Sequence, residues 1–367
     1  MNEAFLVVGC GISGITAAER IANVLGKKVL VLEKRDHIGG NCFDYIDPQT
    51  GILINKYGAH LFHTNSKRVW DYVNQFSKWV RWEHQVLSYV EGQFVPVPVN
   101  ITTVNRLCGQ NIQTTEEMDE WLKENQVKYD TIENSEQMAK SRVGEALFAK
   151  MFEPYTKKQW NKHARELAPS VLARIPIRND FDVRYFSDKY QALPEKGYTE
   201  LFKNMLDHPL IDVKLGVDFL EIKKSRDLSK YTIIYTGPVD QYFDTCYGSL
   251  EYRSIKFDLS RYKMNFFQPN SVVNYPELKY PFTRRVEYKH FLNQKSPYTV
   301  VVSESTIDHG EPFYPVPSKR NLELHERYQE LMRKEKNVFF MGRGTYKYYN
   351  MDQAVENALD EISRFAV

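Results

Sequence analysis

The sequence predicts an α/β protein with a discontinuous Rossmann-like domain that binds a dinucleotide, an inserted helical domain and an antiparallel β-sheet domain. Three observations lead to this fold class. A strand, a glycine loop, a helix and a second strand follow one another near the N-terminus. Helical patterns fill residues 101–165, and a buried strand leads into a glycine turn and a helix near the C-terminus. Since units of the dinucleotide-binding type stand near both ends, other elements must interrupt that domain.

The N-terminal unit has the order of a dinucleotide site. Residues 4–8 (AFLVV) form an apolar run typical of a buried parallel strand, and the loop GCGISG follows at once. Gly9 permits the tight turn, Gly11 lets a pyrophosphate approach the backbone, and Gly14 lets the next helix pack closely on the strand. The start of that helix offers N–H groups and a positive dipole end to phosphates. The expected cofactor contacts here are Gly9, Gly11, Ile12, Ser13 and Gly14.

An acidic residue completes this unit. The second apolar run, KKVLVLEKR, contains Glu33 at the end of the expected strand. A carboxylate at that place after the glycine loop accepts hydrogen bonds from ribose hydroxyls. A lone G-x-G-x-x-G is a weak signal, but the full strand, loop, helix, strand and acid is a strong one.

A glycine pair then narrows the cofactor. Gly39 and Gly40 follow the second strand; NAD dehydrogenases do not need them, whereas flavoproteins of the glutathione-reductase-like class often carry them. NADP is the alternative cofactor, since Lys34 and Arg35 could bind its 2′-phosphate, but the charge of Glu33 would repel that group. The sequence therefore favours FAD and a Rossmann-like FAD-binding domain. Further expected contacts are Glu33, Lys34, Gly40 and Asn41.

Composition excludes several other classes of protein. The net charge of +2 lacks the basic excess of a nucleic-acid-binding protein. The 24 tyrosines suit sugar or nucleotide recognition, and chance enrichment of the core explains them equally well. The four cysteines share no CxxC spacing, which favours a reducing compartment. No run approaches the ~18 apolar residues of a membrane span. We therefore expect a cytoplasmic protein without a membrane span.

The middle of the chain has a helical part and an irregular part. Thr114 and Glu117 make a capping box, and a helical pattern ends at Pro154. Residues 174–198 place three arginines among aromatic residues and read as a poor helix. Such a loop suits phosphate binding and base stacking, and a solvated surface loop is an alternative of equal weight.

The loop at 58–63 contains two histidines three residues apart, His60 and His63. Zinc ligands often have this spacing, but the sequence offers no third ligand cluster, so no metal is predicted. Two polar loop histidines are the simpler interpretation. Contact of this loop with the flavin ring is the alternative.

The C-terminal half supplies the rest of both sheets. Residues 271–275, 280–291 and 298–305 read as strands of an antiparallel sheet. The buried strands at 231–235 and 337–342 return to the nucleotide-binding domain. The second of them precedes Gly342, Arg343 and a helix starting at Met351, which we expect near the flavin ring. Cofactor contacts expected from these strand ends are Thr236, Gly237, Gly342, Arg343, Tyr349, Asn350, Met351, Asp352 and Gln353.

These elements divide the chain into three parts. The expected FAD-binding domain comprises 1–70 with 205–247 and 330–367, the helical domain 101–165, and the antiparallel sheet and substrate domain 71–100 with 166–204 and 248–329.

Ten motifs spread over nearly the whole chain resemble, in order, the bacterial-type UDP-galactopyranose mutase family. They are GCGISG, EKRDHIGGN, KYGAHLFHTN, YTKKQW, RIPIR, YFSDKYQALPEKGY, IIYTGPVDQYF, LEYRS, PFTR and GRGTYKYYNMDQ. The resemblance implies an isomerase that interconverts UDP-galactopyranose and UDP-galactofuranose without net redox change. It also implies that FAD is active in its reduced form, with N5 as the nucleophile at the anomeric carbon.

The resemblance further implies roles for individual residues. Arg174, on a mobile loop, and Arg284 would grip the diphosphate, and Arg343 would lie near flavin and sugar. These three are the expected catalytic residues. The implied substrate-binding residues are Tyr155, Thr156, Trp160, Arg174, Tyr185, Asn270, Arg284, Tyr314 and Tyr349. His60, Leu61 and His63 would lie beside the flavin, with no metal implied. Cys10 in place of serine and Met151 in place of an aromatic residue depart from the family pattern.

Partners and alternatives follow from the same resemblance. The expected ligands are UDP-galactose and UDP-galactofuranose, with NAD(P)H or a reductase as reductant, a homodimer as the assembly and galactofuranose biosynthesis as the pathway. A UDP-N-acetylgalactosamine mutase shares almost all the motifs and stays open as an alternative. A flavin-dependent amine or alcohol oxidase would need an apolar cage rather than convergent arginines. A non-catalytic FAD- or NAD-binding sensor would need no phosphate clamp.

Overall fold

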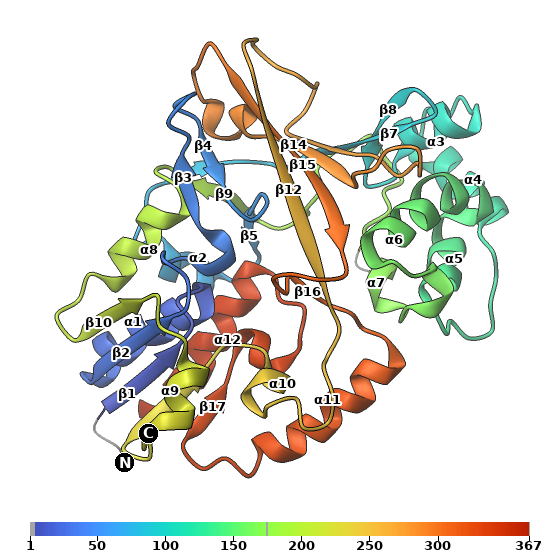
Figure 1. Cartoon of the computed structure of the whole chain (residues 1–367). Helices are drawn as coiled ribbons and strands as arrows, with labels where there is room; N and C mark the ends of the chain where they lie inside the picture. The colour runs from blue at the N-terminus through green and yellow to red at the C-terminus, as the bar shows by residue number, and fades with distance from the viewer. Residues whose placement is uncertain (1–3, 174, 367) are drawn as a thin grey trace.

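A five-stranded parallel sheet joins the two ends of the chain (Figure 1). The computed structural model describes residues 4–173 and 175–366. The sheet has the order β10–β2–β1–β11–β17, and all its pairings are parallel. Its strands are β1 (Ala4–Val8), β2 (Lys28–Glu33), β10 (Ile211–Leu215), β11 (Tyr231–Tyr235) and β17 (Val338–Phe340). The predicted discontinuous Rossmann-like fold is confirmed.

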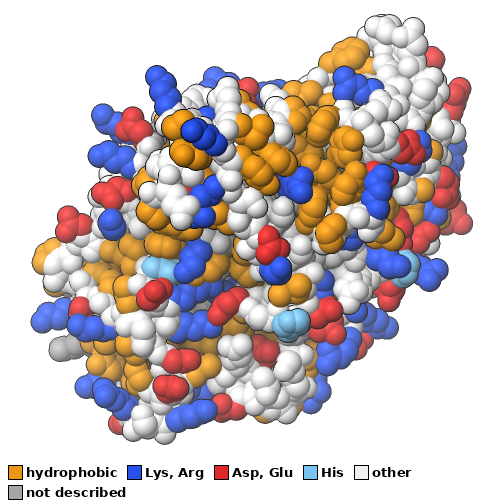
Figure 2. Space-filling model, turned by 45° about the horizontal axis from the view of Figure 1, so that its top comes forward, with side chains coloured by type: hydrophobic (Ala, Val, Ile, Leu, Met, Phe, Trp, Pro, Cys, Tyr) orange, Lys and Arg blue, Asp and Glu red, His pale blue; other side chains and the backbone are white. Residues whose placement is uncertain are grey.

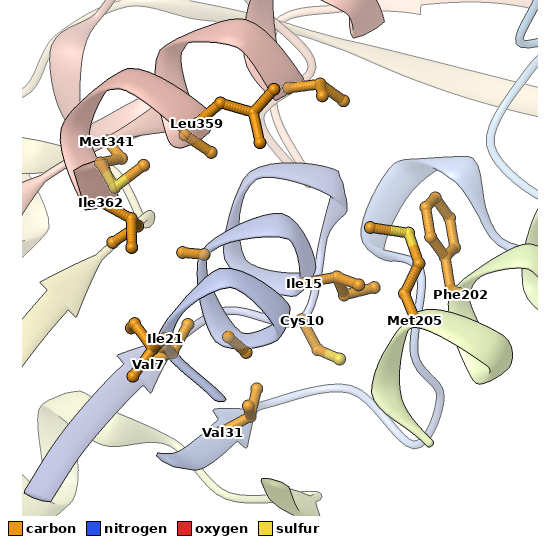
Figure 3. Close-up of a cluster of buried hydrophobic side chains, with 14 of the residues drawn as sticks. Val7, Cys10, Ile15, Ile21, Val31, Phe202, Met205, Met341, Leu359 and Ile362 are labelled. Carbon is orange, nitrogen blue, oxygen red and sulfur yellow. The ribbon is translucent and has the colours of Figure 1, made fainter. Parts of the chain in front are cut away.

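Both faces of this sheet are covered, because its strands are apolar on both sides. Phe5 and Val7 of β1 face a core made with α1 (Ile12–Leu25), α8 (Tyr198–Leu206) and α12 (Met351–Ser363). Figure 3 shows α1 in the middle of this core, with Phe202 and Met205 reaching it from α8. Leu6 and Val8 face the other side, where α9 (Phe219–Ser225) and α10 (Val239–Tyr242) pack. Each such fully buried side chain stabilises the fold by about 1.5–3 kcal/mol.

The second sheet has seven strands in the order β16–β12–β15–β14–β13–β7–β8. Its strands are β7 (Val86–Val90), β8 (Gln93–Val97), β12 (Tyr252–Tyr262), β13 (Val272–Asn274), β14 (Arg284–Glu287), β15 (Thr299–Ile307) and β16 (Tyr314–Pro315). The predicted antiparallel sheet is confirmed with one exception, since β13 and β7 pair in parallel. The proline-containing strand β8 lies at the edge, where a missing N–H is tolerated.

The helical part lies at the β7–β8 end of this sheet, on the right of Figure 1. Its helices are α3 (Ile101–Cys108), α4 (Thr115–Asn125), α5 (Ser135–Leu147), α6 (Glu153–Trp160) and α7 (Ser170–Ala173). The Thr114–Glu117 capping box is present. The prediction that the helical pattern ends at Pro154 was wrong. A π-helical turn over Phe148–Phe152 leads into α6, where Pro154 occupies the first turn and its missing N–H costs no hydrogen bond.

Small sheets and turns connect these parts. The remaining strands are β3 (Asp44–Ile46) with β4 (Leu53–Asn55), and β5 (Phe62–Thr64), β9 (Tyr190–Pro194) and β6 (Trp79–Arg81) in one sheet. The remaining helices are α2 (Lys67–Val73), α11 (Lys319–Met332) and 3₁₀ turns at Gly40–Cys42, Ala164–Glu166, Tyr288–Asn293, Gly342–Thr345 and Arg364–Ala366. Strand β10 ends at Leu215, and three residues later Asp218 caps α9.

The three-part division stays a proposal, with one adjustment. Helix α8 begins at Tyr198 and packs on α1. We therefore propose that the FAD-binding part starts again near 198 rather than 205. Acidic and basic side chains are interspersed over the face shown in Figure 2, as the small net charge suggests. Within the described residues, no helix is long and apolar enough to cross a membrane.

Candidate active site

One cavity of about 890 Å³ connects the carboxyl ends of the parallel strands with the seven-stranded sheet and α6. Nearly all of the residues predicted to form the site line it. They are Gly9, Gly11, Ile12, Ser13, Gly14, Glu33, Lys34, Gly40, Asn41, His60, Leu61, Tyr155, Thr156, Trp160, Tyr185, Thr236, Gly237, Arg284, Tyr314, Gly342, Arg343, Tyr349, Asn350, Met351, Asp352 and Gln353. Arg174 lies outside the described residues.

The glycine loop forms one end of the cavity. Gly9 has φ +97, and a Cβ there would collide with the side chain of Thr236. Gly40 has φ +55, and a Cβ there would lie 2.8 Å from the Cα of Gly11. Gly11 precedes α1 without a side-chain cap, so the first N–H groups of the helix lack a side-chain acceptor. The loop is shaped for close approach of a phosphate to the backbone.

Glu33 lies beside this loop with its carboxylate held in place. One oxygen accepts from the N–H of Cys10 at 2.7 Å and the other from the N–H of Arg35 at 2.9 Å. Lys34 and Arg35 both pair with Glu311, at 3.3 and 3.2 Å. A carboxylate that already pairs with both cations disfavours a 2′-phosphate there, which counts against the NADP alternative.

A second helix start closes the same end of the cavity. Asn350 and Gln353 form a capping box at α12. The guanidinium of Arg343 donates to the carbonyl of Pro312 at 2.8 Å. Burial, with repulsion from Arg35, lowers the pKa of Arg343. A nearby negative charge would relieve that penalty.

The residues present fit a dinucleotide. Among the described side chains, Nη1 of Arg35 and Oδ1 of Asp352 are buried without a hydrogen-bond partner, and both residues line the cavity. Buried polar atoms of this kind require a partner. A donor beside one helix start and an acceptor at the other match the phosphate and hydroxyl groups of FAD.

Arg284 lies at the other end of the cavity. Its Nε donates to Oε2 of Glu304 at 2.6 Å across neighbouring strands. Burial opposes the charge of Arg284, but Glu304 outweighs it, and the pKa of Arg284 is raised. The second oxygen of Glu304 is buried and has no partner among the described atoms. The sheet therefore presents a permanently charged and oriented guanidinium to the cavity.

Aromatic side chains form the wall between the two ends. Trp160 of α6 contacts Tyr314, with ring centroids 6.5 Å apart, and Tyr314 stacks on Tyr348 at 5.5 Å. Tyr348 lines the cavity and is 43% exposed. Tyr346 does pack, since it is 7% exposed and its hydroxyl donates to the carbonyl of Glu251 at 2.7 Å.

Among the predicted site residues that the structure describes, Asn270 is the one that does not line the cavity. Its side-chain amide donates to the carbonyl of Gln85 at 2.9 Å, and it does not line the cavity. Asn274 does, because it stands on β13 directly opposite Arg284. The alternation of strand β13 was the signal that would have selected Asn274, since it shares a face with Val272, which also lines the cavity.

Two histidines in the cavity wall are neutral at physiological pH. Burial lowers the pKa of His60 to about 4, and burial with repulsion from Arg284 lowers the pKa of His84 to about 3. His60 Nδ1 donates to the carbonyl of Gly58 at 2.8 Å. Within the described part of the chain, no three His, Cys, Asp or Glu side chains are grouped as metal ligands would be.

Comparison with known proteins agrees with this geometry. A family model described as UDP-galactopyranose mutase matches residues 150–348, and one for an NAD(P)-binding Rossmann-like domain matches residues 7–76. A probable UDP-galactopyranose mutase of Klebsiella pneumoniae is 34% identical, over 99% of this chain and 95% of its own length. A dTDP-fucopyranose mutase of Escherichia coli is 32% identical, over 98% of this chain and 97% of its own length.

A solved structure shares the fold. The crystal structure of a reduced UDP-galactopyranose mutase superimposes with a TM-score of 0.80 at 17% identity, covering 100% of this chain and 95% of that one. The likeness to the solved structure shows the fold alone. The sequence matches show the family, because they extend at 34% and 32% identity over nearly the whole chain. The chain therefore belongs to the UDP-galactopyranose mutase family of isomerases.

Proposed function

We propose that this chain interconverts UDP-galactopyranose and UDP-galactofuranose with FAD bound in its reduced form. The observation that carries the proposal is that one cavity combines a dinucleotide cradle with a separate half-buried arginine and a tyrosine-rich wall. A protein that bound only the cofactor would need only the cradle. The second half of the cavity has the chemistry to bind another phosphorylated ligand.

Each half has its own task in this proposal. The reduced flavin, when bound, supplies through N5 the nucleophile for the anomeric carbon. Arg284 stabilises the negative charge of the departing UDP, and the sequence offers Arg174 as its partner. Arg343 lies at the cradle, where its charge favours an anionic flavin. Trp160 and the neighbouring tyrosines hold the nucleotide and exclude water.

The oxidase alternative is less well supported. An amine or alcohol oxidase encloses an uncharged reacting group in an apolar or aromatic cage. Here Arg284 and Glu304 line the substrate end of the cavity. Charged groups at that end favour a ligand that is itself charged.

The test is direct conversion. The purified protein with FAD is incubated with UDP-galactofuranose, with and without dithionite, and the nucleotide sugars are separated by chromatography. UDP-galactopyranose is expected only in the reduced sample. Absence of conversion with a fully reduced flavin would overturn the proposal.

A second sugar nucleotide calls for a parallel assay. The dTDP-fucopyranose mutase is 32% identical over 98% of this chain, nearly the same identity as the 34% of the probable UDP-galactopyranose mutase. We therefore propose comparing kcat/KM for UDP-galactofuranose, dTDP-fucofuranose and UDP-N-acetylgalactofuranosamine. The proposed activity predicts the highest value for the first.

A further inference from the structure

His63 and Asp188 form a fixed pair in the cavity wall. Nδ1 of His63 lies 3.0 Å from Oδ2 of Asp188. His63 stands on β5 and Asp188 just before β9, and these two strands pair in antiparallel fashion. The other oxygen of Asp188 accepts from the side-chain amide of Asn65 at 2.9 Å. The strand pairing therefore sets the distance between His63 and Asp188, and the bond from Asn65 helps to fix the direction of the carboxylate.

The imidazole ring is held in its plane as well. It stacks on the ring of Phe186, with centroids 3.6 Å apart and 14° between the planes. Because Nδ1 donates to a carboxylate, a neutral His63 carries its lone pair on Nε2. A histidine oriented by a carboxylate through one nitrogen is the usual arrangement of a general acid or base.

Location separates this pair from similar ones. The described residues contain two further histidine–carboxylate pairs, His163 with Glu153 at 2.6 Å and His290 with Glu287 at 3.2 Å. Neither of those pairs lines the large cavity, whereas His63 and Asp188 both do. Arg284 and Tyr185, which belong to the proposed substrate end, line it with them.

The proposed reaction requires a proton carrier. In the pyranose, C1 is bonded to O5 of the ring, and in the furanose it is bonded to O4. When C1–O5 breaks, its electron pair leaves with O5, and O5 gains a proton. When C1–O4 forms, an O4 lone pair makes the bond and O4 loses its proton. The overall reaction consumes no proton, so a single group that gives one and then takes one completes it.

We propose that His63, oriented by Asp188, carries this proton; the inference rests on the proposed function. The imidazolium donates from Nε2 to O5 as the C1–O5 bond breaks. The neutral ring then takes the proton of O4 as the C1–O4 bond forms, and the imidazolium is restored. In the furanose-to-pyranose direction the two oxygens exchange roles. Asp188 is a positioning residue that also stabilises the imidazolium.

The test separates ring interconversion from cleavage of the bond to UDP. The enzyme with reduced FAD is given UDP-galactopyranose with ¹⁸O in the bond between C1 and the β-phosphate. Movement of ¹⁸O to the non-bridging phosphate positions reports cleavage and return of UDP. Chromatography of unlabelled UDP-galactofuranose conversion reports ring interconversion. His63→Gln retains a hydrogen-bonding group beside Asp188 but cannot transfer a proton.

We expect His63→Gln to lower interconversion by about 10²–10⁴-fold, while ¹⁸O exchange stays within a few fold of wild type. His163→Gln removes the matched pair outside the cavity and should change neither rate. Asp188→Asn keeps the shape of the side chain and should give a smaller loss with the same split. FAD content and Tm are measured for each variant.

Three outcomes are decisive. Interconversion by His63→Gln within a few fold of wild type would overturn the proposal. Equal loss of interconversion and exchange would also overturn it, because His63 would then act in binding or in cleavage of the UDP bond. If the wild-type enzyme shows neither ¹⁸O exchange nor interconversion, the proposed function itself is refuted.

Discussion

Arg284 shows how one residue can be both costly to the fold and useful to the site. Its side chain is 27% exposed and is held at 2.6 Å by Glu304, which is 2% exposed. Removing one partner of such a pair typically costs about 3–5 kcal/mol, since the other charge is left buried. In exchange, the guanidinium needs no reorganisation when a negative charge develops beside it.

Replacing Arg284 with Ala should therefore lower kcat by about 10²–10³-fold while FAD stays bound, because the flavin cradle lies at the other end of the cavity. Steady-state kinetics and the visible absorbance of the purified protein measure the two effects. Arg285→Ala is the matched control, since Arg285 stacks on Phe282 at 4.3 Å and does not line the cavity. Loss of the yellow colour from Arg284→Ala alone would mean that the residue serves the cofactor.

The two buried histidines predict how stability depends on pH. Burial holds the pKa of His60 near 4 and that of His84 near 3, below the ordinary value of 6.5. Between about pH 6.5 and 4 the unfolded chain binds protons that the folded protein does not. The free energy of unfolding therefore falls as pH falls, by up to about 1.4 kcal/mol per pH unit for each group.

Urea unfolding at pH 7, 6 and 5 measures this slope. His84→Gln removes one titrating group and should flatten the slope relative to wild type. His309→Gln changes an exposed histidine and should leave the slope as it is. An unchanged slope in His84→Gln would show that this residue is not the source.

Single residues were predicted well where backbone chemistry determined them. The glycines and Glu33 follow from the approach of a phosphate and a ribose, and all of them line the cavity. The surroundings of Asn270 and Tyr348 could not be predicted, because side-chain direction depends on tertiary contacts. Asn270 turns to Gln85, and Tyr348 finds its stacking partner, Tyr314, on a different element.

At the scale of elements, the helix starts at α1 and α12 are the parts that the sequence predicted best. Both follow a strand and a glycine turn, and both line one cavity. Strand β12 was missed, although its outer half alternates in burial and it is the longest of the described strands at 11 residues. The parallel pairing of β13 with β7 was also missed, because it joins Val272 to Val86, far apart in the chain, and no local signal encodes it.

The helical part contains a position that only glycine fits well. Gly144 interrupts α5 with φ +79 and ψ 177, and a Cβ there would lie 2.5 Å from the carbonyl oxygen of Asn125. Gly144→Ala should therefore lower the free energy of unfolding by about 1–3 kcal/mol. Gly109→Ala is the control, because Gly109 has φ +63 but open space around it. Equal losses in urea unfolding would mean that the contact with Asn125 contributes nothing.

The whole molecule is arranged so that the cofactor connects distant segments. The cradle takes residues from the first strands, from the end of β11 and from the start of α12. No local segment can form it alone, so FAD binds the folded state and not the unfolded chain. A ligand with that preference stabilises the fold by RT ln(1 + [L]/Kd), about 2.7 kcal/mol at one hundred times Kd.

Removal of FAD should therefore lower Tm, and its return should restore it in proportion to the logarithm of its concentration. Differential scanning calorimetry of the apo protein with increasing FAD measures this shift. FMN lacks the AMP portion of FAD, and with it one phosphate and the adenosine ribose expected beside Glu33, and should give a much smaller shift. Glu33→Ala should need more FAD for the same Tm, while Asp36→Ala, three residues along and exposed, should match the wild type. A Tm that does not depend on FAD would show that the distant segments hold together without it, and that the cradle is preformed and uncoupled from the stability of the fold.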